Sequence, residues 1–184
     1  MTGYQLPVTA QLGEKLFHIK GDFRNVLEIF SWLERQELPE FLRWRIAVEL
    51  FYEEKVEKTD LAEATEYLAW FLRAGEEESP GGVRLFSWQQ DARHIMAGVN
   101  KAAGQELRQL DFVHWWTFLS WFHAMGDGSF LTLVSIRDKL AKGKKLESWE
   151  QEFYRQNKQQ VVLRAREDPI SREEKERLLR RLDG

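Results

Sequence analysis

The sequence predicts an all-α protein of seven to eight packed helices in one domain, with a short N-terminal β-hairpin. Two observations predict this class. Apolar residues recur three and four positions apart through most of the 184 residues, which is typical of amphipathic helices. Ser, Asp and Gly lie where these patterns begin and end, as helix caps do. We therefore expect more than half of the residues in helices and β-structure only within residues 4–20.

The first segment has a different pattern from the rest. Leu6, Val8 and Ala10 alternate with other residues, and Gly13 follows where a turn is expected. Alternation of this kind around a turn residue is typical of paired strands. It predicts a hairpin over residues 4–20.

Three helices are predicted next. Asp22 is the expected N-cap of the first, Pro39 suits the first turn of the second, and Asp60 with Glu63 forms a capping-box pattern for the third, which ends near Gly75. The predicted inner faces are Phe23, Val26, Phe30 and Leu33 in the first helix, Phe41, Trp44, Val48 and Phe51 in the second, widened by Ile46 and Leu50, and Leu61, Ala64, Leu68, Phe71 and Leu72 in the third.

The stretch GEEESPGGV (75–83) has the composition of a linker, because it is acidic and then rich in Pro and Gly. We interpret it as a mobile surface loop inside a single domain that covers residues 1–166.

Further helices are predicted after this loop. Ser87 with Gln90 forms a capping-box pattern for a helix that Gly104 ends. Asp111 is the expected N-cap of the helix 111–125, whose apolar residues occupy more than one side. A helix of that kind is usually central and buried.

The last predicted elements are more varied. The segment that begins at Ser129 contains β-branched residues, so it is predicted to be either a helix or a strand. Ser148 with Gln151 is a capping-box pattern for another helix, and residues 167–184 predict a charged C-terminal helix as an appendage. The apolar stripe of that last helix consists of Leu178, Leu179 and Leu182.

The order of several segments carries a resemblance to a known family. These segments are DFRNVLEIFSWLE (22–34), LRWRIAVELFY (42–52), LAWFLRAGEEES (68–79), FSWQQDARHIMAGVN (86–100), LDFVHWWTFLSWFHAM (110–125), SIRDKL (135–140) and EQEFYRQNK (150–158). In this order and spacing the chain resembles, over residues 4–163, the phage tail-protein family called gene product fifteen. That family occurs in siphophages and prophages and is grouped with tail-assembly chaperones.

The resemblance implies a role in tail morphogenesis without catalysis. Similar proteins are thought to keep the tape-measure protein soluble, to help recruit tail-tube subunits and to be absent from the finished virion. The expected location is the cytoplasm of the infected or lysogenic bacterial host. Such a role is physically reasonable, because a long helix with a bare apolar stripe aggregates and a helical partner can cover it.

Two groups of residues are candidates for partner binding. The aromatic residues of 111–125 are candidate interface anchors, since Trp is enriched among binding hot spots, but they equally suit a core. The C-terminal stripe could pack on its own domain, on a second copy of the chain or on the partner. The candidates are Trp115, Trp116, Phe118, Trp121, Phe122, Leu178, Leu179 and Leu182.

Composition excludes several kinds of site. The absence of Cys excludes disulfides and thiolate ligands, and no apolar stretch approaches the ~20 residues that span a membrane. The N-terminal residues lack the pattern of a signal peptide. With 27 basic and 30 acidic residues, the chain lacks the basic excess of a nucleic-acid-binding protein. We therefore expect neither a membrane nor a nucleic acid as partner.

Catalytic and metal sites are also not expected. The sequence contains no nucleotide-binding glycine motif and no nucleophile elbow. His114 and His123 are too far apart for a helical zinc pair, and the Asp91–His94 pair lacks a second half. The chain is thus predicted to be no enzyme and to hold no cofactor or metal. The alternative to a tail-assembly chaperone is a virion structural protein or a regulatory helical interaction module.

Overall fold

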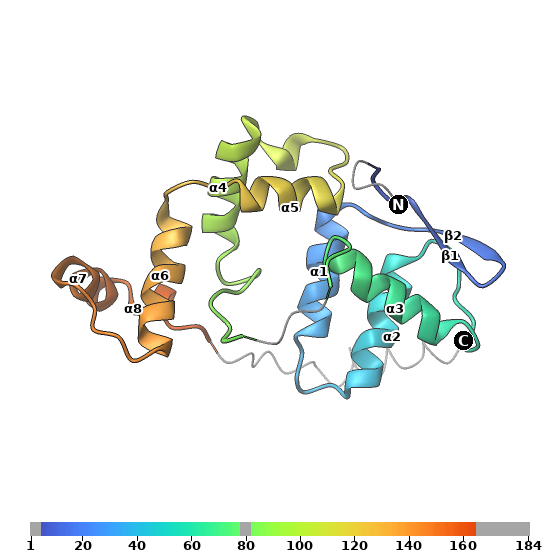
Figure 1. The fold of residues 1–184 in the computed structure, drawn as a ribbon, viewed down its shortest axis with the longest axis horizontal. Helices are drawn as coiled ribbons and strands as arrows, with labels where there is room; N and C mark the ends of the chain where they lie inside the picture. The colour runs from blue at the N-terminus through green and yellow to red at the C-terminus, as the bar shows by residue number, and fades with distance from the viewer. Residues whose placement is uncertain (1–4, 78–81, 165–184) are drawn as a thin grey trace. The chain divides into compact units, whose positions relative to one another are not determined.

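The computed structural model describes residues 5–77 and 82–164 (Figure 1). Helices hold 54% of the described residues, and the strands among them form one two-stranded hairpin, so the predicted fold class is confirmed. The chain divides after Glu77 into two compact units, inside the linker-like stretch 75–83, part of which is outside the described residues. The domain range 1–166 stays a prediction, and the expected helix 167–184 lies outside the described residues.

The hairpin begins the first unit. Strands β1 (Thr9–Leu12) and β2 (Lys15–His18) are antiparallel, and Ala10 lies opposite Phe17. Both of these side chains are buried, whereas Leu16 is exposed, as the alternation of a pleated strand requires. The chain then makes one isolated bridge between Ile19 and Tyr52.

Three helices complete the first unit: α1 (Phe23–Leu33), α2 (Glu40–Phe51) and α3 (Leu61–Leu72). Helix α2 packs against both α1 and α3. The expected N-cap of α1 is confirmed, because the Asp22 carboxylate accepts a hydrogen bond from the Arg24 N–H at 2.9 Å. On α2, Phe41 is 75% exposed, so its predicted inward position is wrong and Leu42 lies inside instead, whereas Ile46 is buried as predicted.

The capping box predicted for α3 is wrong, because both of its residues bind the hairpin. The Asp60 carboxylate accepts from Lys15 Nζ at 2.8 Å, and the Glu63 carboxylate accepts from the Gly13 N–H at 3.1 Å. Asp60 and Glu63 therefore connect α3 to the turn between β1 and β2.

Aromatic residues fill the centre of the first unit. The Phe51 ring lies 4.9 Å from the rings of both Tyr52 and Phe71. The buried Tyr52 hydroxyl donates to the Ala64 carbonyl at 3.0 Å, and the Tyr67 hydroxyl donates to the Thr9 carbonyl at 2.8 Å. Two tyrosine hydroxyls thus bind backbone carbonyls of α3 and β1.

The second unit contains α4 (Ala92–Ala103), a 3₁₀ turn η1 (Leu107–Gln109), α5 (Trp115–His123), α6 (Ser129–Ala141), α7 (Ser148–Gln156) and α8 (Lys158–Val161). Helix α4 packs against α5 and α6, and α8 packs against α6 and α7 (Figure 1). The segment that begins at Ser129 is thus a helix and not a strand. Its Leu133 and Ile136 belong to one buried cluster with Leu146 and Val161. None of the helices in the described ranges is long and apolar enough to cross a membrane.

The starts of two helices differ from prediction by a few residues. Helix α4 begins at Ala92, and Ser87 Oγ accepts from the Gln90 N–H at 3.2 Å in the turn that precedes it. The capping box of α7 is formed by Glu147 and Glu150, one residue before the predicted pair. In both cases the local motif is close to its predicted place.

Two glycines of α4 have definite structural roles. Gly104 ends the helix in the left-handed conformation, with φ of 69°, as predicted. Gly98 lies inside the helix, where a Cβ would stand 2.3 Å from Met125 Sδ. The lack of a side chain at Gly98 therefore lets the end of α5 approach α4 closely.

Candidate protein-interaction surface

Helix α5 begins later than its sequence pattern predicts. Its N-cap is the buried His114, whose Nδ1 accepts a hydrogen bond from the Trp116 N–H at 3.1 Å. Residues 111–113 are not helical, so the prediction that Asp111 caps this helix is wrong. An imidazole nitrogen replaces the expected carboxylate as the cap.

Helix α5 carries the five predicted aromatic candidates, and the structure divides them into two groups. Trp115 and Phe118 have 1% and 0% of their surface exposed, and their nearly parallel rings lie 5.5 Å apart. These two residues belong to the core of the second unit. Trp116, Trp121 and Phe122 are only partly buried.

Phe122 belongs to a set of three partly buried rings in mutual contact, which we call the aromatic triad: Phe86, Trp88 and Phe122. The ring centroids are 5.1 Å apart for Phe86 and Trp88, 5.7 Å for Phe86 and Phe122, and 4.9 Å for Trp88 and Phe122. Beneath the triad, the buried Trp115 lies 5.6 Å from Trp88 and the buried Phe130 lies 5.5 Å from Phe122. Buried aromatic rings therefore pack against the triad.

A buried ion pair fixes the irregular segment that carries two members of the triad. Arg137 Nη1 and Nη2 donate to the two carboxylate oxygens of Asp91 at 2.7 Å and 2.9 Å. Asp91 also accepts from the Ser87 N–H at 2.9 Å, and Arg137 also donates to the Leu85 carbonyl at 3.0 Å. Leu85 and Ser87 flank Phe86, so the pair holds the backbone on both sides of that ring.

The same guanidinium binds the chain around α8. Arg137 donates to the Gln160 carbonyl at 2.6 Å and to the Val161 carbonyl at 2.8 Å. Its five hydrogen bonds use the five N–H groups that a guanidinium possesses. A buried ion pair is tolerated only when such bonds replace the lost hydration, and here the replacement is complete for Arg137.

Sequence reasoning missed Phe86, Trp88 and Arg137 as parts of this surface. The available signal was Arg137 itself, a cation one position after Ile136 and four after Leu133, on the inner face of α6. A charged residue on an apolar face indicates a buried partner. The predicted candidates Leu178, Leu179 and Leu182 lie outside the described residues.

The histidines that could have been metal ligands have other partners. His94 Nδ1 is 2.8 Å from Ser129 Oγ, and its Nε2 is 3.2 Å from Gln160 Oε1. Asp91, three residues earlier, is bound to Arg137. Within residues 5–77 and 82–164, no group of three or more His, Asp or Glu side chains is arranged to hold a metal ion.

A second ion pair connects α6 to α7. Lys139 Nζ donates to both oxygens of the Glu150 carboxylate at 2.7 Å and 2.8 Å, and the Glu147 N–H donates to the same carboxylate at 2.8 Å. These bonds lower the pKa of Glu150, with the Lys139 hydrogen bond as the largest cause, and the same pairing raises the pKa of Lys139. The Glu150 carboxylate therefore completes the N-terminal capping box of α7 and also connects α7 to α6.

Comparison with known proteins identifies the family. No curated protein and no solved structure matches the chain significantly. The sequence profile described as "Bacteriophage Gp15 protein" matches residues 4–163, which include all the described residues except Arg164. The chain therefore belongs to the bacteriophage Gp15 protein family.

Proposed function

We propose that this protein is a tail-assembly chaperone that binds the tape-measure protein of its own phage in the cytoplasm of the infected or lysogenic host. It acts by binding and not by catalysis. Membership of the Gp15 family supports a phage role. The observation that carries the proposal is the aromatic triad, three partly buried rings in mutual contact with the buried Trp115 and Phe130 packed against them.

The geometry suits recognition of an apolar helix. Large aromatic side chains dominate binding energy at interfaces, and they lose little conformational entropy when their base is already packed. The triad is fixed from below by Trp115 and Phe130 and from the side by the Asp91–Arg137 pair. Trp121 adds a partly buried ring on the same helix as Phe122. A helix with an apolar stripe could dock that stripe against these rings.

The test is co-expression of this chain with the tape-measure protein, followed by measurement of the soluble fraction and by pull-down. We expect the tape-measure protein to be soluble only when this chain is present. Trp121→Ala and Phe122→Ala should each weaken capture by about tenfold or more, the loss typical of an interface hot spot.

Trp149→Ala is the matched control, because Trp149 is 55% exposed and lies on α7, outside the aromatic triad. It should leave capture unchanged. Thermal unfolding of each variant separates loss of binding from loss of folding. A second pair, Leu178→Asp with Leu182→Asp, tests the predicted C-terminal stripe. If the tape-measure protein behaves identically with and without this chain, the proposal is wrong and a structural role in the virion becomes the better explanation.

A further inference from the structure

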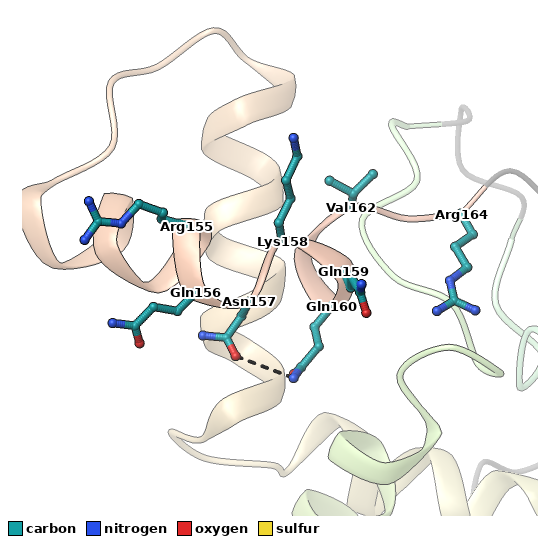
Figure 2. A pocket seen from close by; sticks show the side chains of 8 residues that line it. All are labelled: Arg155, Gln156, Asn157, Lys158, Gln159, Gln160, Val162 and Arg164. Atoms are coloured by element: carbon teal, nitrogen blue, oxygen red, sulfur yellow. Dashed lines mark hydrogen bonds between the residues drawn. The ribbon is translucent and has the colours of Figure 1, made fainter.

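We propose that a basic groove at the end of the second unit binds an acidic segment of a partner protein. The groove has a volume of about 930 Å³ and is formed by the end of α7, by α8 and by the chain that follows (Figure 2). Its side chains are Arg155, Gln156, Asn157, Lys158, Gln159, Gln160, Val162 and Arg164. We call it the basic groove.

The charge of the basic groove has one sign. Arg155, Lys158 and Arg164 are basic, and none of the described residues that line the groove is acidic. Arg155 pairs with Glu152 on its own helix, whereas Lys158 and Arg164 make no ion pair among the described residues. In a chain whose net charge is −3, this is a local excess of positive charge that carboxylates would complement.

Amide side chains fill the space between the cations. The four amides are Gln156, Asn157, Gln159 and Gln160. Three of them already bond within the chain: Gln156 Nε2 donates to Glu152, Asn157 Nδ2 donates to the Phe153 carbonyl at 3.0 Å, and Gln160 Oε1 lies 3.2 Å from His94 Nε2. Because an amide has two donor hydrogens and an oxygen with two lone pairs, each keeps capacity for further hydrogen bonds. A peptide backbone needs both donors and acceptors, and a carboxylate needs donors. The lining therefore fits a polypeptide with acidic side chains.

The backbone of the basic groove is held in place from inside the unit. Arg137 donates to the Gln160 and Val161 carbonyls, and the Gln90 side chain donates to the Val162 carbonyl at 2.9 Å. Gln90 Oε1 also accepts from the Arg164 N–H at 3.0 Å. A surface fixed before binding loses less entropy when a partner docks, which favours a binding role.

The arrangement of the cations distinguishes between kinds of ligand. Figure 2 shows Arg155 at one end of the segment, Arg164 at the other and Lys158 between them, with the side chains pointing in different directions. They do not converge on one point, so a single small anion would reach only one of them. An extended acidic segment could reach several.

A protein segment fits this surface better than a nucleic acid does. Nucleic-acid binding rests on many phosphate contacts with a basic face. Here the groove offers three cations separated by four amides, which is too few for such a run of phosphate contacts.

The experiment measures binding of a fluorescent peptide of alternating Glu and Ala to the full chain by anisotropy at low salt. The groove variant is Lys158→Glu with Arg164→Glu. The control is Lys144→Glu with Lys145→Glu, which makes the same charge change at two exposed residues of the same unit outside the groove. We expect the groove variant to bind about tenfold or more weakly and the control to change by less than about twofold.

A milder pair, Lys158→Gln with Arg164→Gln, keeps the test valid if the charge-reversed variant does not fold. The proposal is overturned if the wild-type chain does not bind the peptide or if the groove and control variants lose affinity equally. Tighter binding of a single-stranded oligonucleotide than of the peptide would also overturn it. So would carbodiimide cross-links, in the monomer, between Lys158 and carboxylates of residues 165–184. The assay contains no phage partner, so its result is independent of the proposed chaperone role.

Discussion

The two compact units satisfy their buried polar groups in different ways. In the first unit, the hydroxyls of Tyr52 and Tyr67 bind backbone carbonyls, and no other described residue that is buried as a whole carries a polar side chain. In the second unit lie all the buried polar or charged side chains of the described residues: Ser87, Asp91, His114, Arg137 and Glu150. The second unit therefore depends on buried charge to a degree that the first does not.

The reason lies in the backbone of each unit. The first unit consists of a hairpin and three helices of 11 to 12 residues, whose peptide groups bind mostly one another. The second combines α4 and α6, of 12 and 13 residues, with three shorter helices, α5 and α7 of nine residues and α8 of four, and with the irregular segment 85–91. The carbonyls of an irregular segment and of a short helix end lack backbone donors, and Arg137 supplies donors to those of Leu85, Gln160 and Val161. In this unit, a buried charged side chain therefore supplies hydrogen bonds that backbone groups supply in the first unit.

The largest effect that would test this comparison is expected from Arg137→Ala. The substitution leaves the Asp91 carboxylate buried and three carbonyls without their donor, so we expect a loss of about 3–5 kcal/mol in the free energy of unfolding. Urea unfolding followed by circular dichroism measures the loss. NMR shift changes should be concentrated within residues 82–164.

Arg35→Ala is the matched control in the first unit, because the Arg35 guanidinium lies 4.1 Å from the centre of the Trp32 ring, where it makes a cation–π contact. Its loss should cost about 0.5–1 kcal/mol. If the two Arg variants lose equal stability, the second unit does not depend on its buried charge.

An intermediate effect is expected from Tyr52→Phe, the corresponding test of the first unit. The substitution keeps the ring and removes the hydroxyl that donates to the Ala64 carbonyl at 3.0 Å. We expect a loss of about 1–2 kcal/mol, since a buried acceptor loses a neutral donor. The same urea titration measures it. A loss as large as that of Arg137→Ala would show that neutral hydroxyls contribute as much as the buried ion pair, which contradicts the comparison.

The smallest effect concerns the Lys139–Glu150 pair and depends on pH. The pKa of Glu150 lies below its ordinary value of 4.5 in the folded protein. Its contribution to stability is therefore complete above about pH 4.5 and is lost as pH falls through the lowered pKa. Glu150→Gln, which retains a side chain suited to the capping box, should remove this part of the acid sensitivity. Urea midpoints between about pH 6 and pH 3 give the measurement. Identical pH profiles for both proteins would exclude this role of the pair.

Local patterns in the sequence predicted the fold well, but they did not predict contacts between residues far apart in the sequence. The caps Asp22 and Gly104 were predicted because each depends only on its neighbours. Asp60 was predicted as part of a capping box but binds Lys15, 45 positions away. Phe86 and Trp88 were missed as site residues because they precede α4 in an irregular segment that has no apolar period.

The connections made by Arg137 also have a consequence for the order of folding. Its partners lie 52, 46, 24 and 23 residues away in sequence. These bonds can form only after the segments on both sides of α6 have been brought together, so chain entropy delays them. We expect them to be largely absent from the transition state for folding. Weakening them should therefore accelerate unfolding of the second unit and change its folding rate little.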